Sequence, residues 1–215
     1  MSDLKLIVGN KNYSSWSMRP WMAMKAAGID FTDEVIPFDF LNDNPAIRAV
    51  SETGKVPLLV HDGFKVWESL AIIEYAAELF PDRPVWPADR KDRALARAYS
   101  MEMATGFRGI RNACPMNLRR PTKAAPVTAD MRADIDRIET IWHRSIRKSG
   151  GPFLFGAFSA VDAMFAPVIN RFEAYVLSQH PETLAYIAAF KAHPAWIAWT
   201  ADAAEETWIV PEDEA

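Results

Sequence analysis

The chain has 215 residues, of which 50% are hydrophobic and 24% are charged, and its formal net charge is −4. This balance supplies enough apolar surface for one large domain or two small ones, and it excludes intrinsic disorder and collagen-like structure. A weakly acidic chain is also a poor general binder of nucleic acid, because phosphate contacts need clustered cations.

Cysteine usage and the first residues indicate where the protein works. Cys114 is the single cysteine, so the chain can form neither an intramolecular disulfide nor a metal site built from several cysteines. Such a chain fits a reducing compartment. The N-terminus carries no basic region followed by an apolar stretch, and no apolar run approaches the roughly 20 residues of a membrane helix. We therefore expect a soluble, cytoplasmic protein with no membrane partner.

The first 80 residues alternate between strand and helix signals. Short apolar runs indicate strands, serines mark helix starts, and glycines mark helix ends. We place Pro20 in the first turn of the first helix, where a proline is tolerated. In chain order, we expect a strand at 4–8, a helix at 14–28, a strand at 31–38, a short helix or irregular segment at 42–50, a hairpin at 56–67 and a helix at 69–80.

Beyond residue 80 the strand signals nearly vanish. Three prolines between 81 and 87 interrupt regular structure and indicate a linker. Ser159 and Asp162 have the spacing of a capping box, which predicts a helix start. We expect helices at 92–103, 128–149 and 159–175, an interrupted segment at 106–127 and two helices flanking 193–194. The chain thus divides into an α/β domain at 1–82, a linker at 83–90 and an all-α domain at 91–215.

Several chemistries are excluded by missing motifs. The chain has no glycine-rich phosphate loop and no Gly-x-Ser-x-Gly nucleophile elbow. Its four histidines are far apart in sequence and form no His-x-x-x-His pair, so we expect no metal site. The first domain contains no cysteine, which argues against thiol–disulfide chemistry on a thiol of its own.

Three serines after the first strand form the most informative feature. Ser14, Ser15 and Ser17 lie where a strand gives way to a helix N-terminus. Free N–H groups and the positive end of the helix dipole favour an anion there. A hydroxyl at this point can cap the helix, and it can also donate a hydrogen bond to a bound anion such as a thiolate. The residues alone leave both roles open.

Two further segments suggest a peptide ligand. Ser69 is expected to open a helix and can hold a carboxylate, while Glu68 can hold an ammonium group. A capped helix with a solvated glutamate is the alternative. Pro57 is restricted to an edge or a turn, and a cis bond to it would expose the backbone of Val56 for pairing with an extended peptide. With the serine turn, these segments could hold a small extended peptide that has a thiol at one end.

These residues resemble the glutathione transferase family. The segment Ser14–Arg19 is similar to the Ser-Ser-Cys-Ser-x-Arg signature of its zeta class, which includes maleylacetoacetate isomerases. Residues 53–57 and 67–72 resemble the glutathione-binding segments of zeta and plant phi-type enzymes, and the capping box at 159–162 matches one in the family's helical domain. The resemblance implies an α/β thioredoxin-like N-terminal domain, an all-α C-terminal domain, glutathione as co-substrate and a symmetric homodimer.

The resemblance also implies roles for individual residues. Ser14 would stabilise the glutathione thiolate, with Ser15 close by. Arg171 falls where zeta enzymes carry an arginine for the carboxylate of an acidic substrate. Trp16 replaces the zeta cysteine, so the general family is better supported than the isomerase class. The residues implied to bind glutathione are Lys55, which replaces the usual glutamine, and Val56, Pro57, Glu68 and Ser69.

An electrophile would have to lie between the two domains, against apolar side chains. The candidate pocket residues are Tyr13, Phe107, Ile110, Met116 and Trp208, with Arg111 in a basic stretch beside them. Ordinary core packing is the alternative for each apolar one. Three functions stay open: conjugation of glutathione to small electrophiles, glutathione-dependent cis–trans isomerisation, and a non-catalytic binding or regulatory module. An intact set of peptide-binding residues argues against the third.

Overall fold

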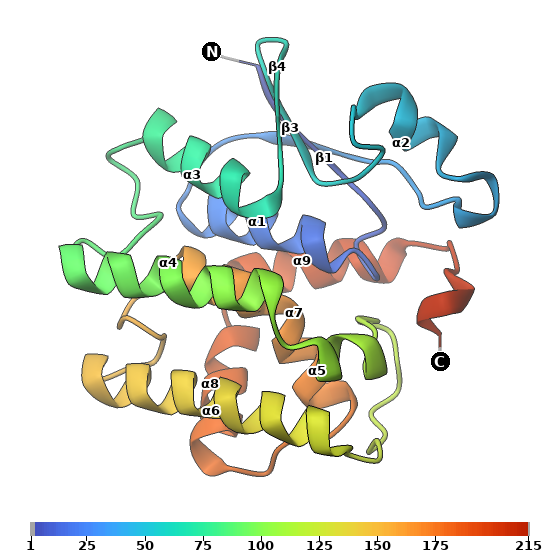
Figure 1. Ribbon diagram of the computed structural model, residues 1–215. Coiled ribbons are helices and arrows are strands. Elements are labelled where there is room, and N and C mark those ends of the chain that lie inside the picture. Colours follow the sequence, from blue (N-terminus) through green and yellow to red (C-terminus); the bar gives the residue numbers. More distant parts are fainter. Residues whose placement is uncertain (1–2, 215) are drawn as a thin grey trace.

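The computed structural model describes residues 3–214 and confirms an α/β part followed by an all-helical part (Figure 1). In chain order the elements are β1 (Leu4–Val8), α1 (Ser15–Ala26), β2 (Thr32–Val35), α2 (Pro45–Val50), β3 (Leu58–His61), β4 (Phe64–Trp67), α3 (Ser69–Leu79), α4 (Arg90–Thr105), α5 (Arg108–Ala113), α6 (Ala129–Ser149), α7 (Ala160–Ala174), α8 (Pro181–Lys191) and α9 (Pro194–Glu205), with 3₁₀ turns at Phe40–Asn42 and Pro211–Asp213. Among the described residues, no helix combines the length and the apolar character needed to cross a bilayer.

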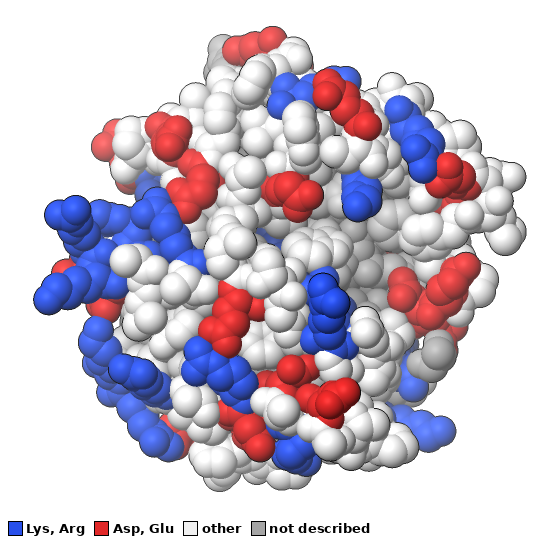
Figure 2. Space-filling model, in the orientation of Figure 1, with Lys and Arg blue, Asp and Glu red and all other residues white. Residues whose placement is uncertain are grey.

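Charge is mixed over the surface. Figure 2 shows Lys and Arg side chains interspersed with Asp and Glu over the visible face. Basic side chains gather at the left edge, near the start of α4, and acidic side chains lie beside them. The visible face therefore carries charges of both signs, in keeping with the small net charge of −4.

The sheet of the first domain is covered on both faces. Its strand order is β2–β1–β3–β4, with β2 parallel to β1 and the other pairs antiparallel. Successive side chains of a strand point to opposite faces. Leu6 and Val8 belong to the core cluster that contains α1 and α3, whereas Ile7 packs with Ile47 of α2. This alternation fixes the register of β1 and orients the turn that follows it.

The predicted hairpin is confirmed, and the second strand is shorter than expected. Asp62 and Gly63 form the hairpin turn with φ angles of 48° and 86°, the left-handed conformation that two-residue hairpin turns favour. We expected a strand at 31–38, but β2 covers only Thr32–Val35. The N–H of Ile36 still donates to Val8, and Pro37, which has no N–H, ends the pairing.

Pro20 lies in the second turn of α1, not in the first turn as expected, because the helix begins at Ser15. A proline has no N–H, so the carbonyl of Trp16, four residues earlier, lacks its partner within the helix. The hydroxyl of Ser69, the first residue of α3, donates to that carbonyl at 2.7 Å. One hydrogen bond therefore joins the start of α3 to α1.

The helical domain follows the predicted pattern at most boundaries. Thr128 caps α6, and Gly150 ends it with a φ of 84°. Its apolar residues Met131, Ile135, Ile138 and Trp142 are buried, and Ile146 is half-buried. In the interrupted segment at 106–127, the one described helix is the short α5.

Asp162 fastens the start of α7 to its surroundings. It is fully buried and accepts the N–H of Ser159 at 2.9 Å, which confirms the capping box. Its other oxygen accepts the N–H of Leu154 at 3.0 Å and the hydroxyl of Tyr186 at 2.9 Å. Burial raises the pKa of Asp162 to about 6, although its donors oppose this shift. One side chain therefore connects α7 with α8 and with the preceding loop.

The turn before α1 is held by the C-terminal domain. The carboxylate of Glu206 accepts the N–H groups of Lys11 at 2.6 Å and of Asn12 at 3.0 Å. The indole of Trp199 donates to the carbonyl of Lys11 at 3.0 Å, and the ammonium of Lys11 pairs with Asp202 at 2.6 Å. The serine turn that follows is therefore fixed against both domains.

Candidate active site

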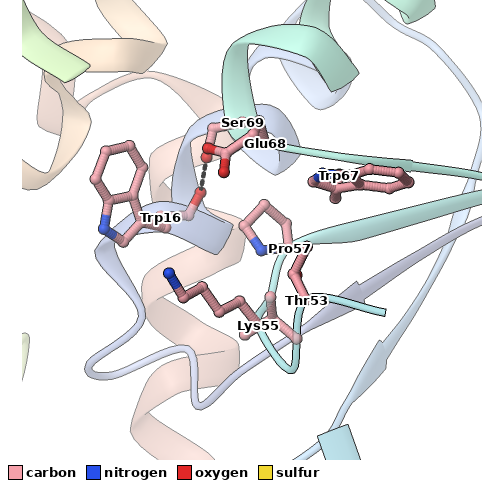
Figure 3. A pocket seen from close by; sticks show the side chains of 8 residues that line it. Trp16, Thr53, Lys55, Pro57, Trp67, Glu68 and Ser69 are labelled. Atoms are coloured by element: carbon pink, nitrogen blue, oxygen red, sulfur yellow. Dashed lines mark hydrogen bonds between the residues drawn. The ribbon is translucent and has the colours of Figure 1, made fainter. Parts of the chain in front are cut away.

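The expected peptide-binding residues surround one cavity, called the first cavity below. It has a volume of about 170 Å³. Figure 3 shows Lys55, Pro57 and Glu68 around the same space, with Trp16 on one side and Trp67 on the other. Its lining residues are Trp16, Thr53, Lys55, Val56, Pro57, Trp67, Glu68 and Ser69. All five residues implied to bind glutathione are among them.

The backbone around this cavity has two special features. The peptide bond between Val56 and Pro57 is cis, as expected. Glu68 has a φ of 67°, a conformation that costs a non-glycine residue about 1–3 kcal/mol. No side chain caps α3, so the N–H groups of its first turn are open to a ligand beside the exposed Glu68 carboxylate. This edge can hold an ammonium and a carboxylate close together, as in an amino acid.

Ser69 differs from the expected role. Its hydroxyl proton is donated to the Trp16 carbonyl, as the dashed line in Figure 3 indicates. The same proton cannot also be donated to a ligand carboxylate. Ser69 can therefore contact a ligand through its backbone N–H and its hydroxyl lone pairs. Its hydroxyl proton instead serves the Trp16 carbonyl, which has no partner within α1.

A second cavity, of about 510 Å³, opens between the two domains. It shares Trp16, Lys55 and Val56 with the first cavity, so the two are neighbours. Figure 2 shows the surface hollowed right of centre, with acidic and basic side chains at the rim. The other lining residues are Tyr13, Ser14, Ser15, Phe38, Phe40, Asn44, Ile47, Gly54, Arg111, Asn112, Pro115, Met116, Arg171, Glu212 and Asp213.

The two serines in this cavity differ in burial and in hydrogen bonding. Ser14 is buried, caps α1, and donates its proton to the Oγ of Ser17 at 2.7 Å. The same Oγ accepts the N–H of Gly9 at 3.1 Å, which ties the turn together. Ser15 is half-buried at the first position of α1, and its hydroxyl has no hydrogen-bond partner among the described residues. Ser15 is therefore the hydroxyl that can donate to an anion at this helix N-terminus.

Cations gather beside the second cavity. Arg111 and Arg171 line it, while Arg19 is fully buried on α1. The guanidinium groups of Arg19 and Arg111 lie against the indole of Trp16, at 4.1 and 4.8 Å from the ring centroid. Burial, and then the neighbouring guanidinium groups, lower the pKa of Arg19, and burial lowers the pKa of Arg171 to about 10. The local field favours an anion.

Three predicted pocket residues do not line the cavity. Phe107 is buried and packs against Phe165 with ring centroids 6.5 Å apart. Ile110 lies in the same core, because α5 turns its apolar side towards the other helices. Trp208 is 47% exposed, and its carbonyl accepts from Arg119 at 2.9 Å. The predicted residues that do line the cavity are Tyr13, Arg111, Met116 and Arg171.

Sequence reasoning missed the acidic wall of this cavity. Glu212 and Asp213 come from the last 3₁₀ turn, and no local pattern signals that this turn returns to the first domain. Tyr13 donates to Glu214, a contact between residues 201 positions apart, and the amide of Asn117 donates to Glu214 at 3.1 Å. The charged segment is thus fastened over the cavity.

Two histidines that are distant in sequence meet in space, contrary to expectation. The rings of His143 and His180 lie 4.2 Å apart because the start of α8 packs on α6. With Glu182 they form a group whose potential metal-ligand atoms lie within 4.8 Å of one another. Each already has a partner: His143 contacts the hydroxyl of Thr183, His180 caps α8, and Glu182 pairs with Arg147.

Comparisons with known proteins match this architecture. The chain fits the family models "Glutathione S-transferase, N-terminal domain" over residues 13–79 and "Glutathione S-transferase, C-terminal domain" over residues 106–202. A probable maleylacetoacetate isomerase from Caenorhabditis elegans is 30% identical over 205 residues, which cover 90% of this chain and 95% of that protein.

Solved structures are similar as well. A glutathione transferase homologue from Burkholderia gl BGR1, solved with bound glutathione, is 26% identical with a TM-score of 0.73. The similarity covers 95% of this chain and 100% of that one. Glutathione transferase Omega 2S from Trametes versicolor is 19% identical with a TM-score of 0.73 over 99% of each chain, a similarity of fold.

The fold and the cavities define a two-domain protein in which a small cavity lies next to an open pocket between the domains. Together with the family matches, they show that the chain belongs to the glutathione S-transferase family. The resemblance drawn from the sequence motifs is thereby confirmed, and the relatives carry the names of glutathione transferases and maleylacetoacetate isomerases.

Proposed function

We propose that this chain binds glutathione in the first cavity and that Ser15 stabilises its thiolate for attack on a small electrophile in the second. The junction of the cavities supports this proposal: Trp16 and Val56 border both, and the unpartnered Ser15 hydroxyl borders the second. A peptide whose γ-glutamyl end lies at Glu68 and whose backbone runs along Val56 would direct its thiol towards the serine turn.

The energetic demand on Ser15 is modest. A free thiol has a pKa of about 8.5, so most of it is protonated at neutral pH. A hydroxyl donor and a helix N-terminus each contribute about 0.5–2 kcal/mol towards the thiolate, enough to lower the thiol pKa by roughly one unit. None of the described residues that line either cavity is a histidine, so Ser15 would act as a hydrogen-bond donor rather than a nucleophile. Ser14 would shape the turn.

Glutathione-dependent cis–trans isomerisation is a second candidate. It is supported by the 30% identity to a protein named probable maleylacetoacetate isomerase. It is also supported by Arg171 and Arg111 in the second cavity, because guanidinium groups suit the carboxylates of an acidic substrate. A non-catalytic module is disfavoured, since such a protein has no need of a complete peptide-binding set.

Binding and turnover test the proposal in sequence. Saturating glutathione should raise the melting temperature, because a ligand of the folded state stabilises by RT ln(1 + [L]/Kd). Turnover should then be measured with aryl halides, epoxides and cis-enoic diacids. Conjugation of the first two classes supports the transferase, and isomerisation of diacids alone supports the second candidate. Absence of a thermal shift at millimolar glutathione would contradict both.

We further propose that the protein works as a symmetric homodimer in the cytoplasm, where glutathione is kept reduced. Large apolar side chains are exposed on the outer strand and on α4: Phe64 is 61% exposed, Trp67 40% and Met101 48%. A second copy covering them would remove apolar surface from water. Light scattering that gives a stable monomer at micromolar concentration would contradict the dimer.

A further inference from the structure

Arg19 is a buried cation without an anion. Its side chain on α1 is fully buried, and none of its three guanidinium nitrogens has a hydrogen-bond partner among the described residues. Arg171 on α7 is also buried, and its Nη1 likewise has no hydrogen-bond partner among the described residues. Its Nε donates to the carbonyl of Cys114 at 2.7 Å. A buried charge without a partner is costly, so its retention needs a reason.

Trp16 connects these cations to the candidate site. Arg19 and Arg111 both lie against its indole, and a cation over an aromatic ring is favourable. Arg111 donates to the carbonyl of Ala104 at 3.0 Å, and it forms no ion pair with a carboxylate among the described residues. Trp16 itself lines both cavities. The two guanidinium groups of this Arg19–Trp16–Arg111 stack therefore lie next to the junction at which the two cavities meet.

The other charged groups around this junction do not cancel the field. Lys55 adds a cation to both cavities. Glu68 lies in the first cavity, and Glu212 and Asp213 lie on the C-terminal wall of the second. Burial raises the pKa of Asp213, and the neighbouring Arg171 opposes this shift. Arg111 of α5 and Arg171 of α7 line the second cavity, and Arg19 of α1 is buried beside Trp16.

We propose that the Arg19–Trp16–Arg111 stack favours the thiolate form of glutathione bound at the serine turn. This inference rests on the proposed function. Arg19 is sealed from the cavities and cannot touch an electrophile, so it acts through its field, which is strong where water is excluded. The three side chains are positioning residues that assist the Ser15 hydroxyl. A thiolate at the junction would supply the anion that these cations lack.

The test is an ultraviolet titration of the thiolate of bound glutathione in the full chain. Arg19→Met and Arg111→Met should each raise the pKa of the bound thiol by about one unit, which means about tenfold less thiolate below that pKa. Arg108→Met is the matched control, since it removes the same charge from an exposed position on the same helix as Arg111. The control should leave the titration unchanged.

A second readout separates this role from a structural one. Arg19→Met replaces an unpartnered buried cation with an apolar side chain of similar length, so without glutathione its melting temperature should equal or exceed that of the parent chain. If this variant does not fold, the half-buried Arg111 carries the test alone.

Three outcomes would overturn the inference. The first is a folded, glutathione-binding Arg111→Met or Arg19→Met variant with an unchanged thiol titration. The second is a loss of activity confined to carboxylated electrophiles, which would assign the cations to the substrate. Both leave the proposed function standing. The third, absence of glutathione binding by the parent chain, overturns the proposed function and this inference with it.

Discussion

The two cavities differ in where their walls come from. The first is small and is lined by α1 and by two segments of the first domain, at 53–57 and 67–69. The second is larger and takes walls from both domains, including the last 3₁₀ turn. A site within one domain keeps its shape as long as that domain folds, whereas a site between domains depends on how the two pack.

This difference suggests a division of roles. The first cavity offers backbone groups, one carboxylate and a cis bond, which suit one invariant ligand. The second combines Phe38 and Met116 with Arg111, Arg171 and Asp213, so its selectivity can change through side chains on either domain. Variants that affect one cavity and spare the other are therefore the most informative.

The largest expected effect is on the stability of α7, the helix that brings Arg171 to the second cavity. Asp162→Ala removes a buried acceptor and leaves the N–H of Ser159 and the hydroxyl of Tyr186 without a partner. Because each unsatisfied buried group costs about 1–3 kcal/mol, we expect a loss of about 3 kcal/mol or more in urea unfolding. Asp130→Ala, an exposed acid at the start of α6, is the control. An Asp162→Ala variant that melts like the parent and loses only activity would contradict the structural role.

The next effect should be confined to the first cavity. Glu68→Gln removes the proposed partner of the glutathione ammonium, and losing one charge-assisted hydrogen bond costs about 1.5–3 kcal/mol. Calorimetric titration should show the weaker binding, with folding little changed. Glu78→Gln, at the other end of α3, should bind as the parent does. Equal affinities for the two variants would remove Glu68 from the site.

Ser69→Ala tests the link between α3 and α1. It leaves the Trp16 carbonyl without the donor that replaces the missing N–H of Pro20, so we expect a loss of about 1–3 kcal/mol in unfolding free energy. Ser15→Ala, which breaks no side-chain hydrogen bond among residues 3–214, should stay within about 0.5 kcal/mol of the parent. If the stability of Ser69→Ala matched that of the parent while glutathione binding fell, the hydroxyl would belong to the ligand after all.

The smallest effect concerns the acidic wall of the second cavity. Asp213→Asn removes a negative charge that faces incoming carboxylates, so kcat/KM for an acidic electrophile should rise about fivefold, or about 1 kcal/mol. Kinetics with a neutral aryl halide should not change, and neither should glutathione affinity. A rise of equal size for both electrophiles would show that the segment acts by blocking the cavity and not by its charge.

The sequence predicted the first cavity better than the second for a physical reason. Lys55, Val56 and Glu68 lie in short segments whose motifs also determine the local backbone, so pattern and geometry coincide. The wall that contains Asp213 is formed by contacts across most of the chain, and no periodicity reports them.

Errors inside correctly predicted elements have a similar origin. Phe107 and Ile110 lie in the predicted region, but the direction in which α5 turns decides whether they face the cavity or the core. Ser14 and Ser15 are adjacent, and only the helix start distinguishes the cap from the free hydroxyl. Pro20 falls in the second turn because the cap is Ser14, the first of the three serines, rather than a later one.

The thiolate titration of bound glutathione in Ser15→Ala and Ser14→Ala tests the central claim most directly. Ser15→Ala should raise the thiol pKa by about one unit, or about 1.4 kcal/mol, because it removes the donor to sulfur. Ser14→Ala should leave the titration nearly unchanged and lower the unfolding free energy by about 0.5–2 kcal/mol, because Ser14 caps α1. A shift only in Ser14→Ala would move the role back to the first serine, and no shift in either variant would contradict the mechanism.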